Sequence, residues 1–248
     1  EQMGRDLPRT HALPDLTQAD WEHLRKEDAV RQAVMLAEVG RRDAAADDLV
    51  WLVRTGDPKD YGALSRLSRA LGLTGAQTFM AYNAPRGEGA HPSLRYPVTF
   101  RAPVGGWRVD PALAFAHALQ ESNFRETVVS PAGAIGLMQI MPITQREYAA
   151  SINMSSGADL KDPAVNLAFG QRTLESLNSS NFTQGKLPKV MAAYNAGPTP
   201  VSRWESEIRD QGDPLLYMES IPYWETRGYV AVVMRNYWMY LRQADAPA

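Results

Sequence analysis

Apolar residues recur at helical spacing along the first third of the chain. Ala29, Ala33, Leu36 and Val39, for example, follow one another at intervals of three or four positions. Such spacing puts the apolar side chains on one stripe of a helix, which is buried when the helix packs against a neighbour. The pattern predicts helices within residues 17–40, 42–56, 57–72 and 73–84.

Glycines separate these predicted helices. Gly40, Gly56 and Gly72 each follow the end of an apolar pattern. Glycine adopts the left-handed conformation that ends many helices, so all three are predicted to be C-terminal caps. We therefore expect a small domain of stacked helical hairpins at residues 21–90, preceded by an extended lead-in at residues 1–20.

A segment rich in Pro and Gly, residues 84–107, breaks the helical pattern and is the predicted domain junction. After it, Asp110 is predicted to cap a helix that starts at Pro111, where the missing N–H costs nothing. Strand-like alternation is almost absent, so the fold class is mainly α, with a second domain at residues 91–248. Its further helices are expected at residues 144–151, 162–178, 187–195, 200–208 and 227–244, with Asp162 as a cap.

The composition excludes several classes of protein. With 26 Lys and Arg against 28 Asp and Glu, the chain lacks the basic field that nucleic-acid binders use, so no nucleic-acid partner is expected. Without cysteine it can form neither a disulfide nor a thiolate metal site. The four histidines are scattered and no HExxH motif occurs, so neither a metal nor a cofactor is predicted.

The sequence contains no apolar run of the length that spans a bilayer, so no transmembrane segment is expected. The first residues, EQMGRDLPRT, have neither the basic nor the apolar region of a signal peptide. Because the chain begins with Glu rather than Met, we expect a signal peptide that has been removed, or a truncated N-terminus.

One acidic residue, Glu121, lies at the end of the predicted helix that begins at Pro111. That helix is apolar on most sides, so the carboxyl group is expected to be only partly hydrated. Desolvation and the negative end of the helix dipole both disfavour the carboxylate and raise the pKa of Glu121, as a general acid requires. A cationic His117, one turn earlier, would oppose these shifts, whereas a neutral and hydrogen-bonded histidine would not. A plain capping glutamate is the alternative.

The next segment, SPAGAIGLMQIMP at residues 130–142, is suited to a ligand site. Gly133 and Gly136 allow backbone to approach a bulky ligand, and Gln139 brings an amide donor and acceptor. Met138 and Met141 add adaptable apolar surface, which packs either on a sugar ring or in the core.

Four motifs together resemble those of the soluble lytic transglycosylases. They are ESNF at residues 121–124, SPAGAIGLMQIMP at 130–142, AAYNAGP at 192–198 and ESIPYWETRGYV at 219–230. Their order matches the family's, which implies a lysozyme-like catalytic domain at residues 91–248. Residues 21–84 resemble more loosely the helical linker domain that precedes it in the family.

The resemblance implies a periplasmic enzyme that cleaves the β-1,4 bond between N-acetylmuramic acid and N-acetylglucosamine in peptidoglycan without water as nucleophile. The expected product has a 1,6-anhydromuramoyl end. Glu121 matches the residue that acts first as acid and then as base. Ordinary glycosidases need two carboxylates, whereas a route that uses the sugar's own hydroxyl can spare the second.

The resemblance also assigns the residues around the acid. Ser122 is expected to order the site, and Tyr194 and Asn195 to face Glu121 across the groove, with the Tyr194 hydroxyl bound to the carboxyl group or to the N-acetyl group. Glu225 would orient Tyr194 or bind substrate. The full set of expected substrate-binding residues is Ser122, Gly136, Met138, Gln139, Met141, Tyr194, Asn195 and Glu225.

Two other functions fit parts of this pattern. A hydrolytic, lysozyme-like muramidase would use the same glutamate to activate water. A non-catalytic glycan-binding module would use only the groove, although binding alone needs no protonatable buried carboxyl group. The expected partner in each case is a peptidoglycan strand, and the sequence indicates no protein partner.

Overall fold

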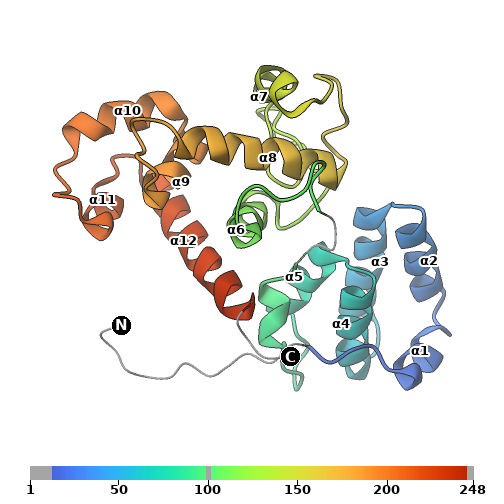
Figure 1. Ribbon diagram of the computed structural model, residues 1–248. Coiled ribbons are helices and arrows are strands. Elements are labelled where there is room, and N and C mark those ends of the chain that lie inside the picture. Colours follow the sequence, from blue (N-terminus) through green and yellow to red (C-terminus); the bar gives the residue numbers. More distant parts are fainter. Residues whose placement is uncertain (1–12, 99–101, 245–248) are drawn as a thin grey trace. The chain divides into compact units, whose positions relative to one another are not determined.

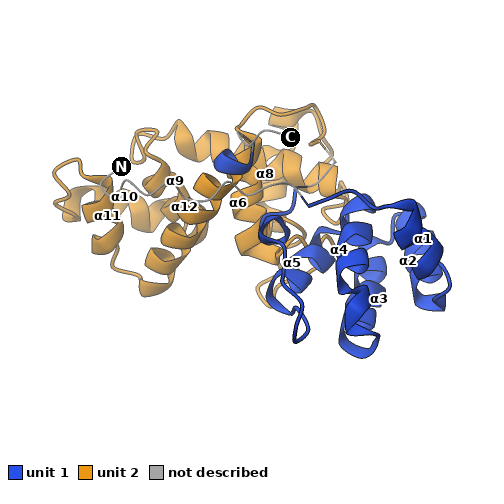
Figure 2. Cartoon of the chain, turned by 90° about the horizontal axis from the view of Figure 1, so that it is seen from below, with its two compact units in different colours: residues 1–100, 241–248 blue, residues 101–240 orange. Residues whose placement is uncertain are grey.

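The computed structural model describes residues 13–98 and 102–244, and all regular elements in those ranges are helices (Figure 1). The predicted mainly α class is thus confirmed. The chain forms two compact units, residues 1–100 with 241–248, and residues 101–240 (Figure 2). This division falls in the Pro- and Gly-rich segment, while the domain boundaries at residues 20 and 90 stay predictions. Residues 1–12 of the expected lead-in lie outside the described residues.

The first unit contains five α-helices and two short 3₁₀ turns among its described residues. They are α1 (Gln18–Leu24), α2 (Asp28–Glu38), α3 (Arg42–Thr55), η1 (Pro58–Asp60), α4 (Tyr61–Ala70), α5 (Thr74–Tyr82) and η2 (Pro92–Arg95). The single helical region expected at residues 17–40 is two helices. Helix α1 ends at Leu24 with Arg25 as its C-cap, and α2 begins at Asp28 after Glu27, whose backbone is extended.

The three glycines end their helices in two ways. Gly40 and Gly72 have φ of 79° and 63°, the predicted left-handed conformation. Gly56 is the C-cap of α3, as predicted, but with φ of −87° it is extended and not left-handed. A Cβ at Gly56 would lie 2.7 Å from the carbonyl oxygen of Leu52, so a close backbone approach requires glycine there.

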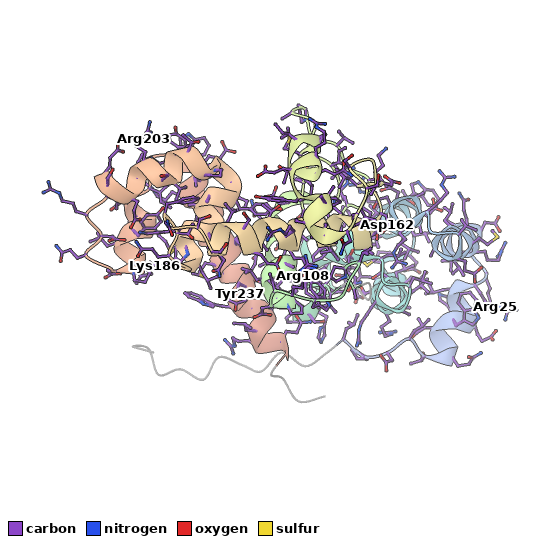
Figure 3. The ribbon with its side chains drawn as sticks, turned by 45° about the horizontal axis from the view of Figure 1, so that its top comes forward. Arg25, Arg108, Asp162, Lys186, Arg203 and Tyr237 are labelled. Carbon is purple, nitrogen blue, oxygen red and sulfur yellow. The ribbon has the colours of Figure 1, made fainter. Side chains whose placement is uncertain are left out.

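The second unit holds the remaining elements: α6 (Pro111–Ser122), α7 (Pro142–Tyr148), η3 (Ala150–Ile152), α8 (Pro163–Asn178), α9 (Leu187–Ala196), α10 (Pro198–Glu207), α11 (Pro214–Ser220) and α12 (Trp224–Ala244). Prolines at the first helical position are frequent, since φ is already helical there and no amide N–H is lost. The Asp110 and Asp162 side chains accept from the amides at the start of α6 and α8, as predicted. Asp162 is labelled in Figure 3. Helix α11 was not predicted.

Two helices far apart in sequence, α6 and α12, are joined at both ends. The Tyr237 hydroxyl of α12 donates to Asp110 Oδ2 at the start of α6, at 2.9 Å. Tyr229, two turns earlier, donates to Glu121 at the end of α6. The two helices therefore run antiparallel, and this pairing places the end of α6 beside the first turns of α12.

Helix α8 forms the centre of this unit, and its middle is fully buried. A Cβ at Gly170 would lie 2.1 Å from Met138 Sδ, so α8 has no room for a side chain at this position. Met138 is itself fully buried, so the loop that carries it packs directly on the α8 backbone. Glycine at this position allows that close approach.

We predict that Gly170→Ala destabilises the second unit by about 1–3 kcal/mol, because the added methyl group overpacks the contact with Met138. Gly228→Ala is the control in the same unit, since nothing lies within 4 Å of its Cβ position. That change should stabilise by about 0.5–1 kcal/mol through helix propensity. Chemical denaturation of both variants measures the difference. If both variants changed the free energy of unfolding by the same amount and in the same direction, the packing explanation would be contradicted.

Candidate active site

Glu121 lies in the last turn of α6, as predicted. The helix ends at Ser122, and Asn123 and Phe124 follow with φ of 50° and 58°, both left-handed. Two successive left-handed residues reverse the chain sharply. Phe124 is anchored because its buried ring packs against Phe115, with ring centroids 6.3 Å apart. The reversal brings the loop of residues 125–141 back over the end of α6.

The carboxyl group of Glu121 is subject to two opposing effects. Burial raises the pKa of Glu121 to about 7, while a hydrogen bond from Tyr229 favours the carboxylate and lowers it. The Tyr229 hydroxyl lies 2.6 Å from Oε1. The predicted direction of the shift, and its cause by desolvation, are confirmed. Such a group is able to hold and to release a proton near neutral pH.

Tyr229 is the residue of this site that the sequence analysis missed. It lies within the quoted motif ESIPYWETRGYV, four residues after Glu225, and therefore on the same side of α12 one turn later. The acidic residue of the same motif, Glu225, is the one whose type suggests chemistry in the sequence. Glu225 is exposed in the first turn of α12, and the described hydrogen bonds include none between Glu225 and Tyr194.

Tyr194 does not donate to the Glu121 carboxyl group, which was one of the two roles predicted for its hydroxyl. Its hydroxyl donates to the carbonyl oxygen of Met138 at 2.8 Å. Burial raises the pKa of Tyr194 well above its usual value, and the charge of nearby Glu121 raises it further. Tyr194 is thus a neutral donor close to the acid, and it holds the loop.

Asn195, the next residue, is exposed and accepts a hydrogen bond from Thr226 of α12 at 2.7 Å. This bond ties the end of α9 to the first turns of α12. The ends of α6 and α9 and the beginning of α12 therefore meet at one place, which Glu121, Tyr194 and Tyr229 share.

The glycine-rich loop is fixed to α8 by one side chain. Asn166 is fully buried, and its Nδ2 donates to the carbonyl oxygens of Ile135 and Leu160, both at 2.8 Å. Its Oδ1 accepts from the Met138 amide at 2.8 Å. Gly136, with φ of 77°, makes this possible, since a Cβ there would lie 2.4 Å from the Asn166 amide nitrogen. Gly136 therefore contributes to the site by letting the loop backbone lie close to Asn166.

The other residues of the loop divide between core and surface. The side chain of Met138 is fully buried against Gly170, so the prediction that this side chain lines a sugar groove was wrong and the core alternative holds. Gln139 is half-buried with φ of 49°, and its amide donates to the Gly136 carbonyl at 2.8 Å. Met141 is half-buried at the start of α7.

Ser122 connects the acid's helix to the same loop. Its buried hydroxyl lies 2.8 Å from the Leu137 carbonyl and 3.2 Å from the Ala118 carbonyl. These contacts agree with the ordering role expected for Ser122. The structure thus groups Glu121, Ser122, Tyr194 and the Met138 backbone, with Asn195 bonded to Thr226 beside them.

Within residues 13–98 and 102–244, no group of three or more His, Asp or Glu is placed to hold a metal ion. No helix in those ranges combines the length and apolarity needed to cross a bilayer.

Several known proteins are similar to this chain in sequence and in fold. Soluble lytic murein transglycosylase of Escherichia coli (strain K12) is 37% identical over 144 residues, which cover 57% of this chain and 22% of that protein. The crystal structure of the 70-kDa soluble lytic transglycosylase from Escherichia coli matches with a TM-score of 0.77 at 26% identity, covering 94% of this chain and 38% of that one.

An inactive glutamate-to-glutamine mutant of lytic transglycosylase Slt from Pseudomonas aeruginosa matches with a TM-score of 0.69 at 25% identity, covering 96% of this chain and 39% of that one. The chain spans about a fifth of the length of the E. coli relative. The sequence profile described as Transglycosylase SLT domain matches residues 99–216, which include Glu121, the glycine-rich loop and Tyr194. Residues 99–216 are therefore similar to the transglycosylase SLT domain, and the chain resembles soluble lytic transglycosylases in sequence and in fold.

Proposed function

We propose that this chain is a peptidoglycan lytic transglycosylase that cleaves the β-1,4 bond between N-acetylmuramic acid and N-acetylglucosamine. The observation that carries the proposal is the place of Glu121, a partly buried carboxyl group that accepts a hydrogen bond from Tyr229, in a segment that matches the transglycosylase SLT domain. Burial raises the pKa of this group to about 7, and relatives of the chain are named lytic murein transglycosylases. Among the described residues, no other carboxylate contributes to the pKa of Glu121. A one-carboxyl mechanism fits this environment better than a two-carboxylate hydrolase.

In the first step, protonated Glu121 donates its proton to the glycosidic oxygen as the bond from C1 of the muramoyl residue to that oxygen breaks. The leaving N-acetylglucosamine takes the proton as a hydroxyl group. Positive charge develops on C1 and the ring oxygen, and the Glu121 carboxylate remains beside it.

In the second step, the O6 hydroxyl of the same muramoyl residue attacks C1, and Glu121 removes the O6 proton. A C1–O6 bond forms, the carboxyl group is protonated again, and no water is consumed. An internal hydroxyl competes well with water because its effective concentration is high. The product carries a 1,6-anhydro ring.

Tyr229 favours the carboxylate that exists between the two steps. A hydrogen bond from a hydroxyl group to a carboxylate is stronger than one to a neutral carboxyl group, so the contact gains strength as the proton leaves. Burial opposes it by favouring the neutral acid. The balance of the two keeps both protonation states accessible during one reaction cycle.

The surrounding residues have separate roles in the proposal. Tyr194 and Ser122 hold the loop, Gln139 and Met141 contribute to the sugar sites, and Asn195 and Glu225 bind substrate at the exposed edge. The partner is a peptidoglycan strand, and the compartment is the periplasm, where a wall-cleaving enzyme meets its substrate. The relatives named as murein transglycosylases support both.

We predict that Glu121→Gln lowers turnover of peptidoglycan by about 10²–10⁴-fold, the usual contribution of a general acid or base. The amide keeps the shape of the side chain but has no proton to transfer. Glu219→Gln is the control, since that exposed carboxylate lies in α11 outside the proposed machinery. Mass spectrometry of the muropeptides is the measurement.

Three results would contradict the proposal. Products with reducing muramic ends, one water heavier than anhydro products, would favour the hydrolytic muramidase. Undiminished cleavage by Glu121→Gln would remove this carboxyl group from the mechanism. Absence of cleavage by the wild type, with retained binding to wall strands, would favour the glycan-binding module.

A second prediction concerns Tyr229→Phe, which removes the hydroxyl group that lowers the pKa of Glu121. Glu121 should then stay protonated to higher pH. The alkaline limb of the pH profile, along which turnover falls, should therefore move to higher pH. Turnover itself should fall because the carboxylate intermediate loses its donor. Tyr194→Phe is the comparison, since its hydroxyl donates to Met138 instead. Profiles of kcat/KM against pH test this, and an alkaline limb unmoved in Tyr229→Phe would refute it.

A further inference from the structure

His117 is a buried group that the proposed mechanism does not use. It lies one turn before Glu121 in α6 and is fully buried. Its Nδ1 is 2.9 Å from the Leu113 carbonyl oxygen, which only accepts, so Nδ1 carries the hydrogen. Nε2 is then a bare acceptor, and it has no hydrogen-bond partner among the described residues. A buried acceptor without a hydrogen-bond partner destabilises the folded state, so packing alone does not explain an imidazole at this position.

The imidazole ring contacts both tyrosines of the site. Its centroid lies 4.8 Å from that of Tyr194 and 6.1 Å from that of Tyr229, with interplanar angles of 57° and 59°. These tyrosines donate to the Met138 carbonyl and to Glu121. The three rings come from α6, α9 and α12. His117 therefore touches the ring that holds the loop and the ring that holds the acid.

The ring contributes bulk without charge. Burial lowers the pKa of His117 to about 4, so the imidazole is neutral at neutral pH. The titratable groups that face it are Glu121 on its own helix, Tyr194 on α9 and Tyr229 on α12. Both tyrosines have their pKa raised well above the usual value and are neutral. The acid is thus backed by neutral groups only, and the cation considered from sequence does not form there.

We propose that His117 is a positioning residue, which holds the Tyr194 and Tyr229 rings in place and keeps water away from the buried side of Glu121. Without the imidazole ring, the Tyr229 ring would lose a packing contact that fixes the position of its hydroxyl group, and water would reach the Glu121 carboxyl group. Hydration would favour the carboxylate and lower the pKa of Glu121, whereas a displaced Tyr229 hydroxyl would by itself raise this pKa and leave the acid poorly oriented. The expected net fall in the pKa therefore comes from hydration. The kinetic part of this inference rests on the proposed lyase function, while the geometric part does not.

The test compares His117→Ala, His117→Phe and Leu174→Ala in the full chain. His117→Ala removes the ring, His117→Phe keeps a ring but removes the unpaired acceptor, and Leu174→Ala makes a cavity in the buried face of α8, outside the site. Two quantities are measured: the titration of the Glu121 side-chain carboxyl by ¹³C NMR, and kcat/KM against pH. Thermal unfolding reports stability separately.

In His117→Ala, the pKa of Glu121 should fall from about 7 toward its usual value of 4.5. A fall of one unit already reduces the protonated fraction at pH 7 by about fivefold, and kcat/KM falls with it. His117→Phe should keep the wild-type titration and unfold at a higher temperature. Leu174→Ala should lose stability without moving the titration.

An unshifted Glu121 titration in His117→Ala, with a stability loss like that of Leu174→Ala, would show a purely structural role and overturn the inference. A loss of activity in His117→Phe at unchanged titration would also overturn it, because Nε2 itself would then be needed. If the wild type cleaves no peptidoglycan, the proposed function fails, but the NMR titration still decides the role of His117.

Discussion

The hydrogen bond between Tyr229 and Glu121 is the interaction on which the site depends. It joins two residues 108 positions apart in the chain and fixes how α12 meets the end of α6. Burial alone would leave Glu121 as a neutral acid that gives up its proton reluctantly. The tyrosine hydroxyl alone would favour a permanent carboxylate. Because both act on one group, the pKa of Glu121 lies near 7, where neither protonation state is strongly preferred.

The rest of the second unit keeps this contact in register. Tyr237 and Asp110 hold α12 against the beginning of α6, so the helix pair is fixed at two points. Thr226 and Asn195 connect α12 to α9. Tyr194, one residue away, then reaches the Met138 carbonyl of the glycine-rich loop. Residues of one motif therefore stabilise the backbone of another, which is why several motif residues lie buried and not in an open groove.

Local chemistry made much of the fold predictable. Helix starts such as Asp110 with Pro111 carry their own signal, because the cap and its amide partner are two residues apart. Helix α11 was not predicted because seven residues are too few to show a helical pattern of apolar residues. The extended conformation of Gly56 could not be predicted for another reason. The sequence indicates where a helix ends, but it does not specify which backbone conformation the capping residue adopts.

The site shows the same limit at longer range. Glu121 and the direction of its pKa shift follow from the apolar helix before it, but Tyr229 becomes visible only when α6 and α12 are brought together. Likewise, the burial of the Met138 side chain depends on Gly170, 32 positions later, which no local pattern connects to it.

The neutral surroundings of Glu121 suit the proposed mechanism, in which one group serves as acid and then as base. A fixed positive charge nearby would hold the carboxylate and delay the first proton transfer, whereas a fixed negative charge would hold the acid and delay the second. Tyr194, Tyr229 and His117 instead supply rings that exclude water and carry no charge at neutral pH. Of these, only the Tyr229 hydroxyl lies within hydrogen-bonding distance of the carboxyl group among the described contacts. Its proton is shared more strongly when the carboxylate forms, so its stabilising effect follows the reaction instead of favouring one state throughout.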